Sequence, residues 1–157
     1  MSAQQLDTAT FAPRMGAAVD RFAAAGIQVH LELTETAIMA DPEEACAVLN
    51  ELRSHGARIV LDDFGTGFSA ISWLHQLPVD AIKLDRSFVT GLPDDDASMR
   101  IARLITALAN ELDLALTAEG VETEDQRRAL LALGCTQAQG FLFARPAPLG
   151  DLLARLV

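Results

Sequence analysis

The sequence predicts an α/β fold built on a parallel sheet. Short apolar segments typical of strands alternate with segments of about 10–16 residues typical of helices, and little loop separates them, which indicates right-handed crossover connections. We expect about five strands and six helices. The 157 residues are enough for one domain but few for a complete eight-unit α/β barrel, which typically needs about 250.

The first half of the chain is predicted to form two helices, each followed by a strand. Apolar residues recur on one helical face over 13–25. The next helix begins at Asp41, where Pro42 and Glu44 complete a capping pattern, and it ends at Gly56. The strands cover 27–35, in which apolar and polar residues alternate, and 57–65, which is apolar until two acidic residues near its end.

The second half continues the alternation. The helix before Pro78 must stop there, and Thr123 or Glu124 is suited to open another helix. The expected elements are helices at 71–77, 96–112, 123–133 and 149–156 and strands at 81–85, 114–120 and 138–144. Ligands bind beyond the carboxyl ends of the strands in such sheets, so a functional site is expected there.

Acidic residues outnumber basic ones, which limits the kind of partner. Asp and Glu total 22 against 12 Lys and Arg, the formal charge is -10 and the sequence pI is near 4.6. A nucleic-acid polymer is disfavoured because its affinity for proteins comes largely from lysine and arginine. A small phosphate-containing ligand fits if metal ions supply the positive charge.

The chain carries no sign of export or membrane insertion. Its first residues lack the basic region and apolar run of a secretory signal, and no stretch reaches the roughly 18 apolar residues of a membrane span. Cys46 and Cys135 lie far apart and are expected to be reduced thiols. Structural or exposed positions are expected for His30, His55 and His75. We therefore predict a cytoplasmic protein without a membrane span.

Polar side chains recur at or just past the carboxyl end of every predicted strand. In a parallel sheet these positions converge on one rim, so carboxylates distant in sequence come close together. Hard divalent cations such as Mg²⁺ or Mn²⁺ best compensate their repulsion, because such cations prefer oxygen ligands. The set comprises Glu32, Glu35, Asp62, Asp63, Lys83, Asp85, Glu119, Glu122 and Gln139.

Each of these residues also has a plain structural interpretation. A single acid after a strand is commonly the cap of the next helix or a solvated loop residue. Metal ligation is favoured for Asp62 and Asp63, which end an apolar run, although adjacent side chains of a regular strand point to opposite faces. Lys83 either faces the interior, where it needs a carboxylate or phosphate partner, or faces water on an edge strand.

The turn at 63–69 is rich in glycine. Gly65 and Gly67, on either side of Thr66, indicate positive φ or a close approach to a ligand. The turn suits either a phosphate cradle or a mobile loop above the site, but it lacks the lysine and spacing of a P-loop. On the next helix, a core position or a dimer face is expected for Trp73, Leu74 and Leu77.

Six motifs resemble, in order and spacing, the EAL-type cyclic di-GMP phosphodiesterases. They are Leu31–Thr36 (LELTET), Asp62–Ser69 (DDFGTGFS), Leu77–Asp80 (LPVD), Ile82–Phe88 (IKLDRSF), Ala118–Thr123 (AEGVET) and Gln139–Phe143 (QGFLF). The resemblance implies a parallel-strand (β/α) barrel of the TIM type, here incomplete with about five of eight units. It also implies hydrolysis of cyclic di-GMP to linear pGpG at a two-metal site that holds Mg²⁺ or Mn²⁺.

The resemblance implies roles for individual residues. Glu32, Asp62 and Glu119 resemble metal ligands, and Asp63 resembles the residue that bridges the second metal or the attacking water. Lys83 resembles the residue that orients this water and the scissile phosphate. In the same resemblance Gln139 is a further site residue, Glu35 anchors the loop of Gly65, Thr66 and Gly67 through which family dimers tune activity, and Asp85 and Glu122 support the site.

Part of the family pattern is absent from these 157 residues. The Glu-Ala-Leu motif and its nearby arginine belong to an earlier strand, the metal-binding Asn before the Ser2 segment is missing, and Phe68 and Phe141 stand where Tyr is common. We therefore expect one EAL-type domain over 1–157 that lacks its N-terminal strands and has impaired catalysis. The alternatives are a non-catalytic cyclic di-GMP-binding module, or an interaction module whose open sheet edge is covered by a partner or by a second copy in a homodimer.

Overall fold

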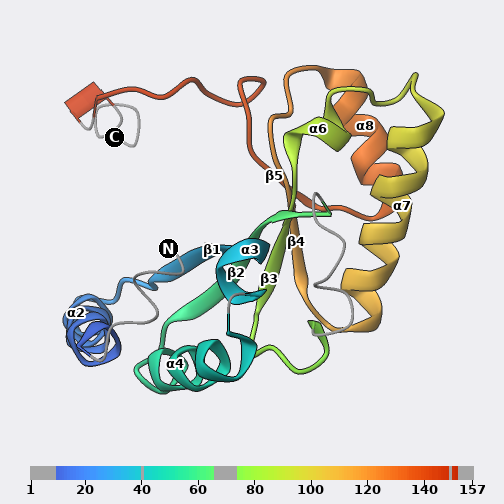
Figure 1. The fold of residues 1–157 in the computed structure, drawn as a ribbon. Coiled ribbons are helices and arrows are strands. Elements are labelled where there is room, and N and C mark those ends of the chain that lie inside the picture. Colours follow the sequence, from blue (N-terminus) through green and yellow to red (C-terminus); the bar gives the residue numbers. More distant parts are fainter. Residues whose placement is uncertain (1–9, 40, 66–73, 149, 152–157) are drawn as a thin grey trace.

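The computed structural model describes residues 10–39, 41–65, 74–148 and 150–151, and these contain one sheet of five parallel strands (Figure 1). The strand order is β1-β2-β3-β4-β5, so each connection leads to the neighbouring strand. The elements are α2 (Phe11–Ala24), β1 (His30–Thr34), α3 (Glu35–Met39), α4 (Pro42–Ser54), β2 (Arg58–Phe64), β3 (Ala81–Leu84), α6 (Arg86–Val89), α7 (Asp96–Glu111), β4 (Ala115–Ala118), α8 (Glu124–Leu133) and β5 (Gln137–Ala138). The predicted parallel α/β fold is confirmed.

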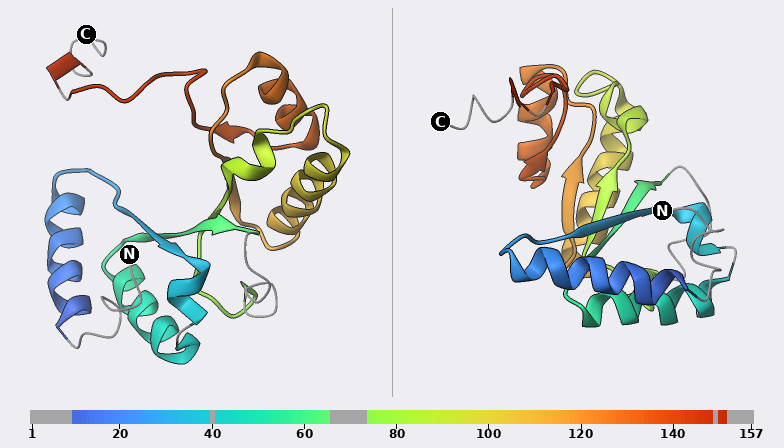
Figure 2. Two further views of the ribbon diagram at one scale, coloured as in Figure 1. Left: turned by 45° about the horizontal axis from the view of Figure 1, so that its top comes forward. Right: turned by 90° about the vertical axis from the view of Figure 1, so that its left-hand side faces the viewer.

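The sheet twists strongly and divides its helices into two groups (Figures 1 and 2). Helix α2 packs on α4, which contacts β2, whereas α7 packs on α8 and contacts both β3 and β4. The register pairs Leu33 with Leu61, and Lys83 with Thr117. All neighbouring strands run parallel, so the carboxyl ends of the strands form one rim.

The core is built from alternate positions of β1, from consecutive positions of β2 and β3, and from one face of each long helix. In β1, Leu31 and Leu33 are buried while the side chain of Glu32 between them is about half exposed, as the alternating pattern predicts. Leu49 of α4 and Ile105 of α7 bury the helix faces that cover the sheet. One side of β1 is therefore committed to packing and its polar residues are left on the other side, whereas β2 is buried on both sides over residues 59–61.

The last strand is shorter than predicted. β5 ends at Ala138, and the sequence pattern predicts a strand over 138–144. The chain turns at Gly140, and the Leu142 N–H then donates to the Val121 carbonyl rather than extending the ladder with β4. The prediction is therefore wrong beyond Ala138, because a contact between two loop backbones replaces strand pairing.

Two short helices were not expected from the sequence pattern, because neither is long enough to display helical periodicity. Helix α3 begins at Glu35, directly after β1. Helix α6 begins at Arg86, where the Asp85 carboxylate caps it by accepting the Ser87 N–H at 3.0 Å. Residues 71–73 of the helix predicted at 71–77, Trp73 among them, and all but residues 150–151 of the helix predicted at 149–156, lie outside the described residues, as do Thr66, Gly67 and Phe68.

The two cysteines, His55 and two leucines of the predicted helix at 71–77 lie outside the rim and have structural positions. Cys46 and Cys135 are free thiols, and burial raises the pKa of both. The Nδ1 atom of His55, at the end of α4, lies 3.0 Å from the Asp20 carboxylate of α2, so it links the two helices. The core interpretation holds for Leu74 and Leu77, which are both buried.

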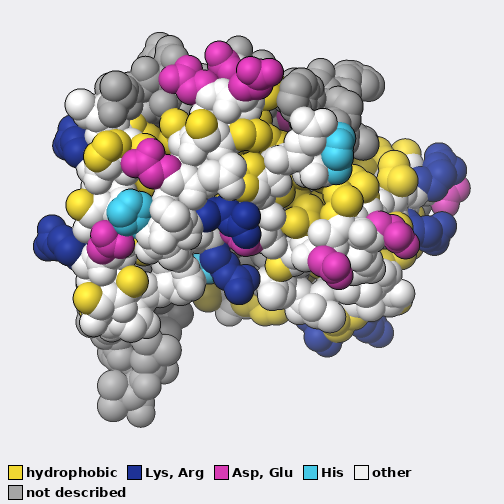
Figure 3. Space-filling model, turned by 90° about the horizontal axis from the view of Figure 1, so that it is seen from below, with side chains coloured by type: hydrophobic (Ala, Val, Ile, Leu, Met, Phe, Trp, Pro, Cys, Tyr) yellow, Lys and Arg dark blue, Asp and Glu magenta, His cyan; other side chains and the backbone are white. Residues whose placement is uncertain are grey.

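Asp80 joins the amino-terminal ends of β2 and β3 to α4. Figure 3 shows the molecule from below the view of Figure 1, with charged side chains interspersed among apolar ones. The Asp80 carboxylate accepts the Ile59 N–H at 2.8 Å and pairs with Arg53 at 2.9 Å. We expect Asp80→Ala to lower the free energy of unfolding by about 2 kcal/mol, measured by urea denaturation, because charge-assisted hydrogen bonds are lost. The control is Asp125→Ala, which removes a highly exposed ion pair with Arg128 and is expected to cost below about 0.5 kcal/mol. Equal costs would contradict the prediction.

Candidate active site

Lys83, on β3, occupies the centre of the carboxyl-end rim. Its Nζ atom lies 2.6 Å from Glu119 Oε1, 2.9 Å from Glu32 Oε1 and 3.4 Å from Asp62 Oδ1. These carboxylates come from β1, from β2 and from the residue after β4, so one ammonium joins three segments of the sheet. The lysine is only 7% exposed, which rules out the edge-strand orientation toward water.

The surroundings of Lys83 favour its charged form. Burial alone would lower its pKa, but hydrogen bonds from the ammonium to Glu119 and Glu32 and the charges of Glu119 and Asp62 outweigh burial and raise the pKa above the ordinary lysine value. Lys83 is therefore a permanent cation at neutral pH. Together with its partners it forms a cluster in which negative charge exceeds positive charge.

Asp62, Asp63 and Glu119 can present oxygen atoms that all lie within 4.8 Å of one another. Two consecutive residues of a regular strand could not do this, but β2 is irregular here, with a register shift against β3 and a positive φ of 55° at Asp63. Aspartate tolerates that conformation better than most residues. Because of this irregularity, the side chains of Asp62 and Asp63 need not point to opposite faces of the sheet, as they would in a regular strand.

Asp63 is destabilised in its charged form. Burial raises its pKa above the ordinary aspartate value, the charges of Asp62 and Asp85 raise it further, and Lys83 partly offsets them. A carboxyl whose pKa rises on folding contributes stability when it is protonated, and that contribution is lost as the pH rises through the folded-state pKa. At neutral pH the charged form of Asp63 therefore costs stability that Lys83 only partly offsets.

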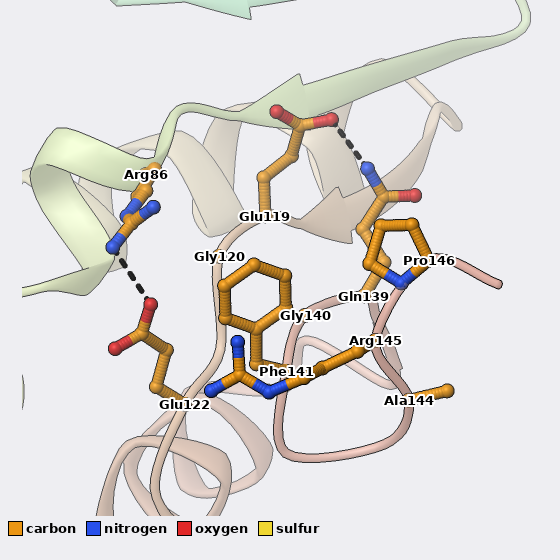
Figure 4. Close-up of a pocket in the computed structure, with 10 residues that line it drawn as sticks. All are labelled: Arg86, Glu119, Gly120, Glu122, Gln139, Gly140, Phe141, Ala144, Arg145 and Pro146. Atoms are coloured by element: carbon orange, nitrogen blue, oxygen red, sulfur yellow. Dashed lines mark hydrogen bonds and ion pairs between the residues drawn. The ribbon is translucent and has the colours of Figure 1, made fainter.

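A pocket of about 390 Å³ adjoins this cluster (Figure 4). On one wall Gln139 donates to Glu119 Oε1 at 2.7 Å, and on the other Arg86 pairs with Glu122 at 2.7 Å. The guanidinium of Arg145 lies 4.5 Å from the ring centre of Phe141. The pocket therefore combines both signs of charge with one aromatic ring and opens beside the acidic cluster.

The structure separates the predicted site residues into groups. Glu32, Asp62, Lys83 and Glu119 are joined directly, with Asp63 in the donor set beside them. Around this cluster, Gln139 and Glu122 line the pocket, Asp85 caps α6, Glu35 is buried at the start of α3, and Gly65 has a φ of 96° at the end of β2.

Sequence reasoning missed Arg86 and Arg145, the two arginines of the pocket. Arg86 directly follows Asp85, so its position after β3 was a usable signal. Arg145 directly follows the strand expected at 138–144, so its position carried a signal of the same kind. Both arginines add positive charge beside carboxylates in an otherwise acidic chain.

Comparison with known proteins identifies the family. The family model of the EAL domain matches residues 1–146. This chain belongs to the EAL family. It is 39% identical over 150 residues to the cyclic di-GMP phosphodiesterase NbdA of Pseudomonas aeruginosa, covering 96% of this chain and 19% of that protein. It is 44% identical over 124 residues to the bifunctional diguanylate cyclase/cyclic di-GMP phosphodiesterase MucR of the same organism, covering 79% of this chain and 18% of MucR.

Solved structures place the EAL fold over nearly the whole chain. The EAL domain of Mycobacterium smegmatis DcpA matches 99% of this chain and 69% of that one, with 40% identity and a TM-score of 0.89. The MucR phosphodiesterase in complex with cyclic di-GMP matches 97% of this chain and 62% of that one, with 36% identity and a TM-score of 0.85. A manganese and cyclic di-GMP complex of BlrP1 from Klebsiella pneumoniae matches 84% and 34%, with 33% identity and a TM-score of 0.76.

The EAL domain described here is thus an incomplete barrel of the TIM type, seen as a five-stranded parallel sheet with its helices. The chain spans about a fifth of each of the two curated relatives named above. Within the residues that the structure describes, every helix is too short or too polar to cross a bilayer.

Proposed function

We propose that this EAL domain binds cyclic di-GMP and supplies residues to a metal-dependent site that hydrolyses it to linear pGpG. The observation that carries the proposal is the convergence of Glu32, Asp62, Asp63 and Glu119 around Lys83, beside a pocket large enough for part of a nucleotide. The solved MucR and BlrP1 complexes contain cyclic di-GMP, which supports the choice of ligand.

The donor set fits a hard divalent cation. Asp62, Asp63 and Glu119 offer only carboxylate oxygens, which Mg²⁺ and Mn²⁺ prefer over softer metals. The raised pKa of Asp63 is a second indication, because a cation would relieve the cost of its charge. When bound, such a cation polarises a phosphate oxygen and makes water a stronger nucleophile at neutral pH.

The chain's own residues prepare the site for this chemistry. Lys83, which holds three carboxylates, is assigned the role of orienting the attacking water and the scissile phosphate. Asp63, in the donor set beside it, is assigned to the second metal or the attacking water. Gln139 fixes the orientation of Glu119, and Arg86, on the opposite wall of the pocket, offers positive charge to a phosphate.

We further propose that these 157 residues act as a single EAL unit whose hydrolytic activity is weak when it is tested alone. These 157 residues contain no Glu-Ala-Leu tripeptide, so a test of them alone proceeds without the metal-binding glutamate of that motif. Each carboxylate removed from a two-metal site leaves the cation less well held.

The test combines calorimetric titration of cyclic di-GMP with chromatography of its products in Mn²⁺ buffer. We expect saturable binding with little pGpG formed. A flat titration would overturn the proposed ligand. Fast turnover that Asp62→Asn abolishes would support hydrolysis but overturn the expected weakness, and fast turnover untouched by Asp62→Asn would point to a contaminating enzyme and leave the site without support.

Assembly is a separate proposal. Among the described strands β1 pairs on one side only, with β2, so its other side presents backbone groups suited to strand pairing. We propose that a second copy of the chain or another protein covers this edge. Light scattering is expected to give a mass above that of the 16.8 kDa chain, and a stable monomer at micromolar concentration would contradict pairing between copies.

A further inference from the structure

Lys83 is the only lysine in the sequence, which otherwise carries eleven arginines. This single lysine lies at the point where carboxylates from three segments of the sheet meet, and its side chain is only 9% exposed. Lysine differs from arginine in being a compact point charge on a flexible stem, so it can pair with several carboxylates and can also leave them.

Two of the carboxylates that contact the Lys83 ammonium also belong to the donor set of Asp62, Asp63 and Glu119. The ammonium contacts Oε1 of Glu119 at 2.6 Å and Oδ1 of Asp62 at 3.4 Å, and both residues also belong to the donor set with Asp63. The third partner, Glu32, contacts the ammonium at 2.9 Å but is outside that set. A cation held by the donor set would therefore draw on two of the three carboxylates that hold the lysine.

Electrostatics makes these two interactions antagonistic. Carboxylates a few ångströms apart repel strongly where water is scarce, and the ammonium offsets that repulsion. A divalent cation would offset it more strongly but would repel the ammonium at the same short range. The site can therefore be neutralised by either cation, and each weakens the hold of the other.

We propose that Lys83 is an internal counter-cation: it holds Glu32, Asp62 and Glu119 together in the metal-free domain, and a divalent cation competes with it for Asp62 and Glu119. The inference rests on the metal site of the proposed function and adds a positioning role for the lysine. It explains how the domain folds with an acidic cluster at its rim before a metal binds.

The first experiment compares wild type with Lys83→Met, which keeps the length of the side chain and removes its charge. In EDTA the variant is expected to melt at a lower temperature than wild type. Calorimetric titration with Mn²⁺ alone is expected to give an affinity at least about tenfold tighter in the variant, and Mn²⁺ is expected to raise its melting temperature more than that of wild type. An unchanged or weaker Mn²⁺ affinity would overturn the proposal.

Arg53→Met is the matched control. It removes the cation of the Arg53–Asp80 pair, which lies at the amino-terminal ends of the strands, away from the rim. Its melting temperature is expected to fall, while its Mn²⁺ affinity and the Mn²⁺-induced rise in melting temperature stay at the wild-type values. Tighter Mn²⁺ binding in this control would overturn a specific role for Lys83.

A second measurement needs no variant and covers the case in which Lys83→Met does not fold. Because Lys83 is the only lysine, an amine-reactive ester can modify just its Nζ and the chain's α-amino group, and mass spectrometry separates the two. Mg²⁺ is expected to speed the modification of Lys83 at least threefold without changing that of the α-amino group. A slower or unchanged rate with Mg²⁺ would overturn the proposal.

The Mn²⁺ measurements and the lysine modification test the competition separately from the proposed function, since neither experiment uses cyclic di-GMP. Wild type that binds Mn²⁺ and shows the lysine effects but gives a flat cyclic di-GMP titration would overturn the proposed ligand alone. Wild type that binds cyclic di-GMP but shows no lysine effect would overturn the competition alone. Wild type that binds no divalent cation at millimolar concentration would overturn the competition as well.

Discussion

Asp62→Asn is expected to weaken Mn²⁺ binding by at least about 100-fold, since losing even an outer-shell partner of a metal site commonly costs 10–100-fold. Asp62 belongs to the donor set with Asp63 and Glu119, and the asparagine keeps its shape while removing its charge and one carboxylate oxygen. Calorimetric titration with Mn²⁺ measures the effect directly, and circular dichroism checks that the fold is intact.

Glu51→Gln is the control for this prediction. It removes one negative charge from an exposed position on α4, which is not part of the rim. Its Mn²⁺ affinity is expected to stay within twofold of wild type. If Asp62→Asn bound Mn²⁺ as tightly as the control, the oxygen donors of the site would have to be sought among other residues.

Gly140→Ala is expected to destabilise the domain by about 3 kcal/mol or more, because the new methyl group has no space. A Cβ atom at this position would lie 2.2 Å from the carbonyl oxygen and 2.3 Å from the nitrogen of Val121, and both are backbone atoms that side-chain rotation cannot move. Urea denaturation measures the loss. Because Gly140 and the preceding Gln139 both line the pocket proposed for the ligand, we also expect the variant to lose cyclic di-GMP binding.

Gly150→Ala is the matched control, because a Cβ atom there would meet no atom within 4 Å. We expect its stability to lie within about 0.5 kcal/mol of wild type. A tolerated Gly140→Ala substitution would mean that the segment after β5 does not pack on Val121 in solution, and the pocket formed by this segment would then have no support.

The sequence by itself was sufficient to predict the parallel fold and to predict which polar residues lie at the carboxyl-end rim. Alternating burial in β1 and the capping pattern at Asp41 depend on near neighbours in the chain, so local physical rules predict them. In parallel strands that follow one another in order, polar residues at successive carboxyl ends must converge. Glu32, Asp62, Lys83 and Glu119 could therefore be placed together without a structure.

Only the tertiary structure decided which residues touch and where β5 ends. The pairing of Lys83 with three carboxylates, and the irregularity that directs Asp62 and Asp63 to one place, depend on the register between strands. The turn at Gly140 depends on Val121, 19 residues earlier, whose carbonyl accepts the hydrogen bond that a longer strand would have made elsewhere. These contacts join residues far apart in the chain, and no local pattern of side chains encodes them.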